Sequence, residues 1–80
     1  MRLEKFAVIG IGQFGKSIAL NLSQRGAEVM AIDINNDKIE NISDEVAYAV
    51  TLNATERKAL LSQDITSFDA VIISIGHPLE

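Results

Sequence analysis

Near its amino terminus the chain reads Phe6-Ala7-Val8-Ile9-Gly10-Ile11-Gly12-Gln13-Phe14-Gly15, an apolar run followed by three glycines. A continuous apolar run that ends in glycine is typical of a strand covered by helices on both faces. Over residues 14–25 apolar side chains then recur at helical spacing, and Gly26 supplies a stop signal. The three glycines therefore lie between a predicted strand over 6–9 and a predicted helix, the context in which such a loop binds the phosphates of a dinucleotide.

Each glycine of this loop has its own expected role. Gly10 permits the tight turn, Gly12 lets the backbone approach a pyrophosphate, and Gly15 lets the helix pack closely on the strand. The N–H groups of the first helical turn face the phosphates, where the helix dipole favours negative charge. Gln13 and Phe14 lie where a side chain can reach phosphates or cover a ligand, although Phe14 fits equally well into the core between helix and sheet. The alternative for the glycines is that they serve only a tight turn.

The rest of the chain alternates strands with helices. Buried strands are predicted over 28–32, 46–51 and 71–75. The side-chain caps Asn35-Asn36-Asp37 predict a short helix that turns Ile39 and Ile42 toward the sheet. Asn53-Ala54-Thr55-Glu56 has the form of a capping box, which predicts a third helix through residues 60–61. The order βαβαβαβ places the chain in the α/β class, as a Rossmann-type three-layer parallel sheet with right-handed crossovers. We interpret residues 1–80 as one domain that holds the amino-terminal part of a fold with about six strands when complete.

Asp33 ends the second predicted strand, 23 positions after Gly10. An acidic residue about 20 positions after the glycine loop accepts hydrogen bonds from the adenosine ribose in dinucleotide-binding folds. The same carboxylate repels a 2′-phosphate, so the sequence favours NAD-type or other unphosphorylated-ribose ligands over NADP. The alternative is that Asp33 only caps the turn that follows it.

Ligands of open parallel sheets lie outside the carboxyl ends of the strands, so the residues after the third and fourth strands are further candidates. These residues are Asn53-Ala54-Thr55 and Ile75-Gly76-His77. The Asn53 amide can meet adenine nitrogens or simply cap its helix. Gly76 lets the backbone approach a nucleotide, and His77 either contacts the nucleotide or is an ordinary loop residue.

Composition and charge argue against several classes of function. The chain has 80 residues, 48% apolar and 22% charged, a net charge of −4 and no cysteine. The acidic balance argues against nucleic acid as a partner. Because no acid–base pair converges and His77 has no partner ligands, we expect neither catalytic residues nor a metal site. No apolar run approaches the length that spans a bilayer, and the cytoplasm is the expected compartment.

Three stretches together resemble a known family: residues 6–17, the run Val29 to Asn35 and the run Asn53 to Glu56. They are similar to the RCK (KTN, TrkA-N) domains that regulate potassium channels and transporters, most closely the KtrA-type cytosolic subunits. The resemblance implies a non-catalytic sensor whose dimers assemble into a ring beneath a potassium-translocating integral membrane subunit. Such a sensor is cytoplasmic and peripheral to the inner face of the cell membrane, and NAD(H), ADP or ATP changes the shape of its ring.

The resemblance also assigns roles to residues. It implies phosphate contacts at Gln13 and Phe14, a ribose contact at Asp33 with Ile34 and Asn35 beside it, and adenine-side contacts at Asn53 and Ala54. One departure stands out, because KtrA-type loops commonly carry arginine where this chain has Gln13. That arginine meets the terminal phosphate of ATP, so glutamine here argues against a strong preference for ATP.

The competing interpretation is the cofactor-binding half of an NAD-dependent oxidoreductase, because a nucleotide-binding fold alone does not separate a sensor from an enzyme. A downstream substrate domain with an acid–base pair favours the enzyme. A small dimeric carboxyl-terminal domain favours the sensor.

Overall fold

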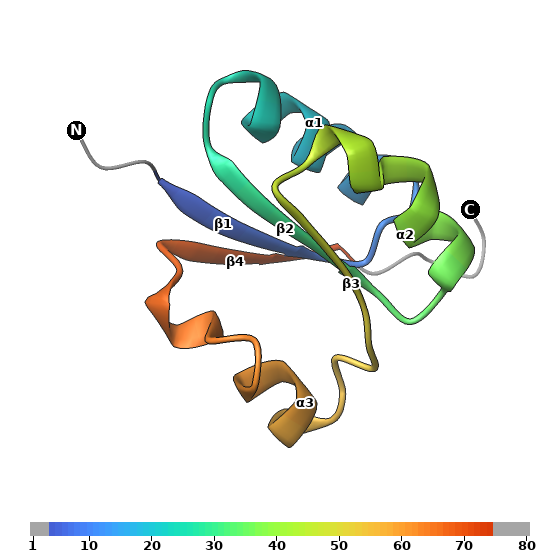
Figure 1. Cartoon of the computed structure of the whole chain (residues 1–80), viewed down its shortest axis with the longest axis vertical. Coiled ribbons are helices and arrows are strands. Elements are labelled where there is room, and N and C mark those ends of the chain that lie inside the picture. The colour runs from blue at the N-terminus through green and yellow to red at the C-terminus, as the bar shows by residue number, and fades with distance from the viewer. Residues whose placement is uncertain (1–3, 75–80) are drawn as a thin grey trace.

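A computed structural model describes residues 4–74 of the chain as strands that alternate with helices (Figure 1). The strands are β1 Lys5–Ile9, β2 Glu28–Asp33, β3 Tyr48–Thr51 and β4 Ala70–Ile73. The helices are α1 Gln13–Gln24, α2 Asn36–Ile42 and α3 Arg57–Leu61, with short 3-10 helices η1 Ser43–Glu45 and η2 Ile65–Ser67. This order confirms the predicted βαβαβαβ arrangement.

All four strands are parallel and form one sheet in the order β3-β2-β1-β4. The chain therefore steps outward from β1 to β3 and then crosses back to place β4 on the other side of β1. In Figure 1, α1 and α2 lie on one face of the sheet and α3 lies on the opposite face. The three-layer Rossmann-type fold is confirmed, and the carboxyl ends of the central strands meet at one edge.

The core lies between the sheet and the layer formed by α1 and α2. Val8, Val29 and Ala31 point from the sheet into a cluster that Ile39 and Ile42 close from α2, as predicted for these two isoleucines. Parallel strands covered by helices need such continuous apolar sequence, because the alternate residues are buried against the other layer. Most of the buried apolar residues among those described lie on this side, and Ala7, Met30 and Ile32 are buried on the other.

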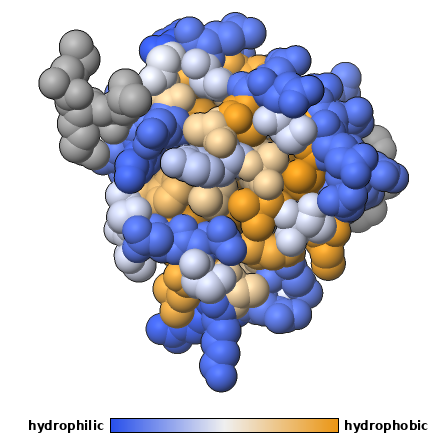
Figure 2. Space-filling model, in the orientation of Figure 1, coloured by the Kyte–Doolittle hydropathy of each residue, from blue (hydrophilic) through white to orange (hydrophobic). Residues whose placement is uncertain are grey.

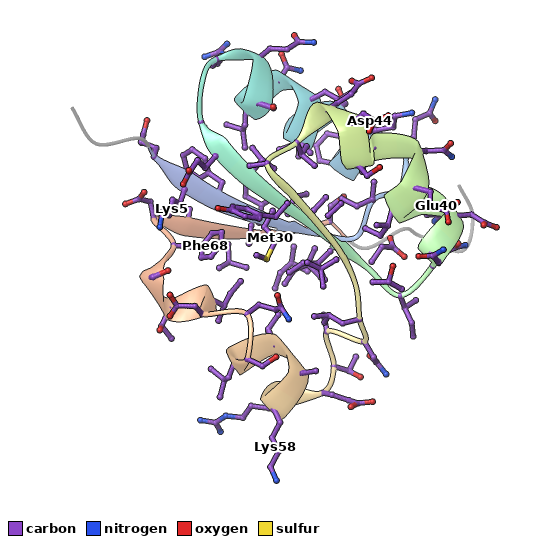
Figure 3. All side chains as sticks on the ribbon, viewed as in Figure 1. Lys5, Met30, Glu40, Asp44, Lys58 and Phe68 are labelled. Atoms are coloured by element: carbon purple, nitrogen blue, oxygen red, sulfur yellow. The ribbon has the colours of Figure 1, made fainter. Side chains whose placement is uncertain are left out.

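The opposite face is covered less completely. None of the five residues of α3 is buried, although Met30 on the sheet beneath is. Figure 3 shows Met30 on the same side of the sheet as Phe68 and α3, while Lys58 extends from α3 away from the sheet. Val71 and Ile73 of the edge strand β4 remain exposed. Figure 2 shows apolar surface in the middle of this view, within an outer rim of hydrophilic residues.

Three predicted element boundaries differ from the structure. The third helix begins at Arg57 rather than directly after Asn53, because the Asn53 side chain closes a turn instead of capping a helix. The third strand begins at Tyr48 rather than Val46, because its pairing with β2 starts opposite Met30. The fourth strand ends at Ile73, and Ile75, where its end was predicted, lies outside the described residues. In residues 4–74 we find no helix with the length and apolar character needed to span a bilayer.

Candidate functional site

The glycine loop joins the end of β1 to the start of α1. Gly10 has a φ of 94°, a backbone conformation that favours glycine, and its N–H donates to the Ile32 carbonyl at 2.8 Å. Gly12 is the N-cap residue of α1, and its carbonyl accepts the N–H of Lys16 at 2.8 Å. No side chain caps this helix, so the N–H groups of its first turn remain as donors toward an anion.

Gly15 is buried where α1 crosses the end of β1. A Cβ at this position would overlap the carbonyl oxygen of Gly10 and lie 3.2 Å from the Cβ of Ser74. The predicted role of Gly15, close packing of the helix on the strand, is therefore confirmed. A Cβ at Gly12 would meet nothing within 4 Å, which leaves open space beside the helix terminus.

Asp33 is half-buried at the carboxyl end of β2, and both of its oxygens accept backbone N–H groups. Oδ2 accepts from Ile11 in the glycine loop at 2.7 Å, and Oδ1 accepts from Asn35 at 2.8 Å. The bond to Asn35 is the turn-capping contact considered as the alternative for Asp33. The contact with a ribose stays a prediction.

A pocket of about 350 Å³ opens at the carboxyl edge of the sheet. Its size falls within the usual range for small-molecule sites, roughly 300–1,000 Å³. Its lining comes from the ends of all four strands: Ile9, Gly10, Asp33, Ile34, Leu52, Asn53, Ala54, Thr55 and Ser74. The sheet thus brings together the glycine loop, the ribose candidate and the predicted adenine-side segment.

Not every predicted residue lines this pocket. Gln13 and Phe14 lie in the first turn of α1, and Asn35 is the N-cap of α2, where its side chain accepts the N–H of Asp37. Ile75, Gly76 and His77 lie outside the described residues.

Three lining residues were not predicted from the sequence: Ile9, Leu52 and Ser74. Each lies at or directly after the end of a strand, so the rule that ligands bind at strand carboxyl ends could have found them. Ser74 was missed because the fourth strand was predicted to run to Ile75.

Two large apolar side chains are exposed beside the site. Phe14 is 71% exposed and Ile34 is 67% exposed. The alternative that places Phe14 in the core between helix and sheet is therefore wrong. Both side chains are available to cover an apolar part of a ligand, such as a purine ring.

The electrostatics of the pocket are simple. Asp33 is the one charged side chain among the lining residues that the structure describes. Negative charge on a ligand must then be met by backbone donors and by the dipole of α1, at some distance from this carboxylate. The described part of the chain holds no group of three His, Cys, Asp or Glu side chains arranged to bind a metal.

Asn53 shapes the far wall of the pocket through its side chain. Its Oδ1 accepts the backbone N–H of Thr55 at 3.0 Å and the Thr55 hydroxyl at 2.6 Å. A short turn thereby presents Asn53, Ala54 and Thr55 to the pocket. The predicted capping box is replaced by this turn, and helix α3 starts after it without a side-chain cap.

Comparison with known proteins gives a consistent picture. The model of the TrkA-N domain family matches residues 6–80. The chain is 47% identical over 77 residues to the Ktr system potassium uptake protein A of Bacillus subtilis, covering 96% of this chain and 35% of that protein. The Ktr system potassium uptake protein C of the same organism is 40% identical, and the match covers 96% of this chain and 35% of that protein. The Ktr system potassium uptake protein A of Vibrio alginolyticus is 34% identical over 91% of this chain and 33% of that protein.

Proposed function

Because this chain belongs to the TrkA-N domain family, we propose that it binds an adenine nucleotide, NAD(H), ADP or ATP, and serves as a regulatory domain of potassium uptake. The observation that carries the proposal is the pocket at the carboxyl edge of the sheet. There Gly10 of the glycine loop, the Asp33 carboxylate and the Asn53 turn line one opening, and the glycine loop leads directly into the uncapped start of α1.

The pocket and the neighbouring start of α1 together suit the parts of such a ligand. The phosphates lie against the backbone N–H groups of residues 12–15, where the helix dipole favours them. The ribose hydroxyls donate to Asp33, whose oxygens can accept more than the two backbone bonds they have. The base lies between the exposed Ile34 side chain and the segment Asn53-Ala54-Thr55.

The chain spans about a third of the length of the relatives it matches. The partners of the whole protein are therefore part of the proposal. The relatives are named as potassium uptake proteins, which supports a potassium-translocating membrane subunit as the partner. We place the domain in the cytoplasm, in a homo-dimer or larger ring at the inner face of the membrane, where bound nucleotide changes the activity of that subunit.

Calorimetric titration with NADH, NAD, ADP, ATP and NADPH tests the binding step. A matched pair of variants tests whether the phosphates bind at the start of α1. Gly12→Asp puts a carboxylate at the N-cap, where the side chain has open space and stabilises the helix but repels phosphate. We expect nucleotide affinity to fall more than about tenfold while the fold is kept.

Gln24→Glu adds the same charge at the far end of the same helix and should leave affinity unchanged. Unchanged affinity in a folded Gly12→Asp variant, or no binding of any of the five nucleotides by the parent chain, would count against the proposal.

A further inference from the structure

The glycine loop is attached to β2 as well as to β1. Its first two N–H groups point across to the end of β2, where Gly10 donates to the Ile32 carbonyl at 2.8 Å and Ile11 donates to Asp33 Oδ2 at 2.7 Å. The Ile11 side chain is 3% exposed and packs in the core. The loop is therefore held by its backbone on one side and by its side chain on the other.

The hydrogen bond from Ile11 to Asp33 differs in its acceptor from the hydrogen bond between Gly10 and Ile32. Its acceptor is a charged side chain, and charge-assisted hydrogen bonds are stronger than those between neutral groups. The second oxygen of Asp33 is held by the N–H of Asn35 at 2.8 Å, which fixes the direction of the carboxylate. A side chain oriented in this way imposes its position on the loop, rather than following it.

We propose that Asp33 is a positioning residue: in the ligand-free domain it holds the glycine loop in the shape that binds phosphate. The part of this inference that concerns ligands rests on the proposed nucleotide-binding function. A loop without this bond has more conformations, and a phosphate must then order the loop as it binds, at a cost in affinity.

The carboxylate also connects two parts of the ligand site. An ionised carboxylate has about four acceptor positions, and the two backbone bonds leave the others for ribose hydroxyls. One side chain thus contacts the ribose and fixes the backbone that contacts the phosphates. The consequence is that Asp33 matters even for a ligand that has no ribose.

Two measurements on Asp33→Ala test this inference, with Asp37→Ala as the control because Asp37 is an exposed carboxylate at the start of α2. The first is amide hydrogen exchange of Ile11 in the ligand-free protein, followed by NMR. We expect exchange at Ile11 to be about tenfold faster or more in Asp33→Ala, with no change in Asp37→Ala. Exchange at Ala31, inside β2 and paired with Ala49 of β3, serves as the internal reference for global stability.

The second measurement is calorimetry with inorganic pyrophosphate and with ADP. A positioning role predicts that Asp33→Ala weakens binding of both, including pyrophosphate, which has no ribose. If Ile11 exchange is unchanged and only ADP binding is weakened, Asp33 is a ribose contact alone and the inference is overturned. If the parent chain binds neither ligand, the proposed function fails, while Ile11 exchange still decides whether Asp33 holds the loop.

Asp33→Asn covers the case in which the alanine variant does not fold. The amide keeps the shape of the side chain but offers one acceptor oxygen to two N–H groups, so either Ile11 or Asn35 must lose its partner. Faster exchange at one of these two amides supports the inference. Unchanged exchange at both overturns it.

Discussion

The two faces of the sheet differ in how firmly they are packed. On the face covered by α1 and α2, Val8, Val29 and Ile42 are completely buried. On the other face, Ala7, Met30 and Ile32 of the central strands are buried, but α3 has no buried residue and Val71 and Ile73 remain exposed. A fully buried apolar side chain stabilises the folded state by roughly 1.5–3 kcal/mol, so the first face, which holds most of the buried side chains among the described residues, contributes the larger share of the stability.

One half of the candidate site belongs to the firmly packed part of the molecule, and the other half belongs to the thinly packed part. The half proposed to bind phosphates is the start of α1, which is packed tightly on β1 through Gly15. The half proposed to bind the base is the turn at Asn53, which leads into the thinly packed α3. The first half is therefore expected to be preformed, whereas the second depends on local hydrogen bonds and has more freedom to adjust to a ligand.

The largest expected effect tests the contrast in packing directly. Ile42→Ala removes a completely buried side chain and should lower the free energy of unfolding by about 2–5 kcal/mol. Leu61→Ala in α3 removes a side chain that is 47% exposed, and it should change the free energy of unfolding by no more than about 0.5 kcal/mol. Urea unfolding followed by circular dichroism measures both. Equal losses in the two variants would mean that the two faces contribute alike, and the comparison would fail.

Gly15→Ala is expected to have the next largest effect. The new Cβ overlaps the Gly10 carbonyl oxygen, so α1 must move away from β1, at a cost of about 1–3 kcal/mol. Because this movement also shifts the phosphate-binding turn, nucleotide affinity should fall in the fraction that remains folded. Gly12→Ala, where the added Cβ has open space, is the control for stability. A Gly15→Ala variant as stable as the parent would contradict the close packing of this helix.

The same contrast explains what the sequence could and could not predict. Long apolar runs and glycine signals identified the elements on the firmly packed face, and Ile39 and Ile42 were placed correctly. The motif at Asn53 was misread, because one Asn side chain can accept from a helix N–H or from Thr55 two residues on. The local sequence pattern does not distinguish a helix cap from such a turn when no core contact fixes the start of the helix.

The interaction of Asp33 with the glycine loop was also beyond sequence reasoning. Its spacing from Gly10 predicts proximity to a ribose, and the turn-capping alternative predicts the bond to Asn35. Nothing in the pattern indicates that Oδ2 reaches the N–H of Ile11, 22 positions earlier. That contact depends on the register of β1 against β2, which places Ile9 beside Ile32.

A smaller effect is expected for the choice between NADH and NADPH. Asp33→Ala removes the acceptor for the 2′-hydroxyl and also the charge that opposes a 2′-phosphate. NADH binding should therefore weaken more than NADPH binding, and the ratio of the two affinities should change by about tenfold, or about 1.4 kcal/mol. Titration of both cofactors against the variant measures this ratio. Equal losses would remove Asp33 from the ribose site and leave it only the loop contact.

The smallest expected effect concerns residue 13, in the firmly packed half of the site. Gln13 is exposed in the first turn of α1, and its neutral amide lacks the charged, fork-shaped donors that arginine offers to a terminal phosphate. Gln13→Arg should raise ATP affinity over ADP affinity by a factor of about three to ten, since an exposed ion pair contributes roughly 0.2–1 kcal/mol and a bidentate one somewhat more. Gln24→Arg, at the other end of the helix, controls for the added charge. Calorimetry at two salt concentrations should show the gain shrinking as salt rises. If the ATP-to-ADP ratio does not change, residue 13 does not face the phosphates, and the phosphate-binding half of the site consists of backbone donors alone.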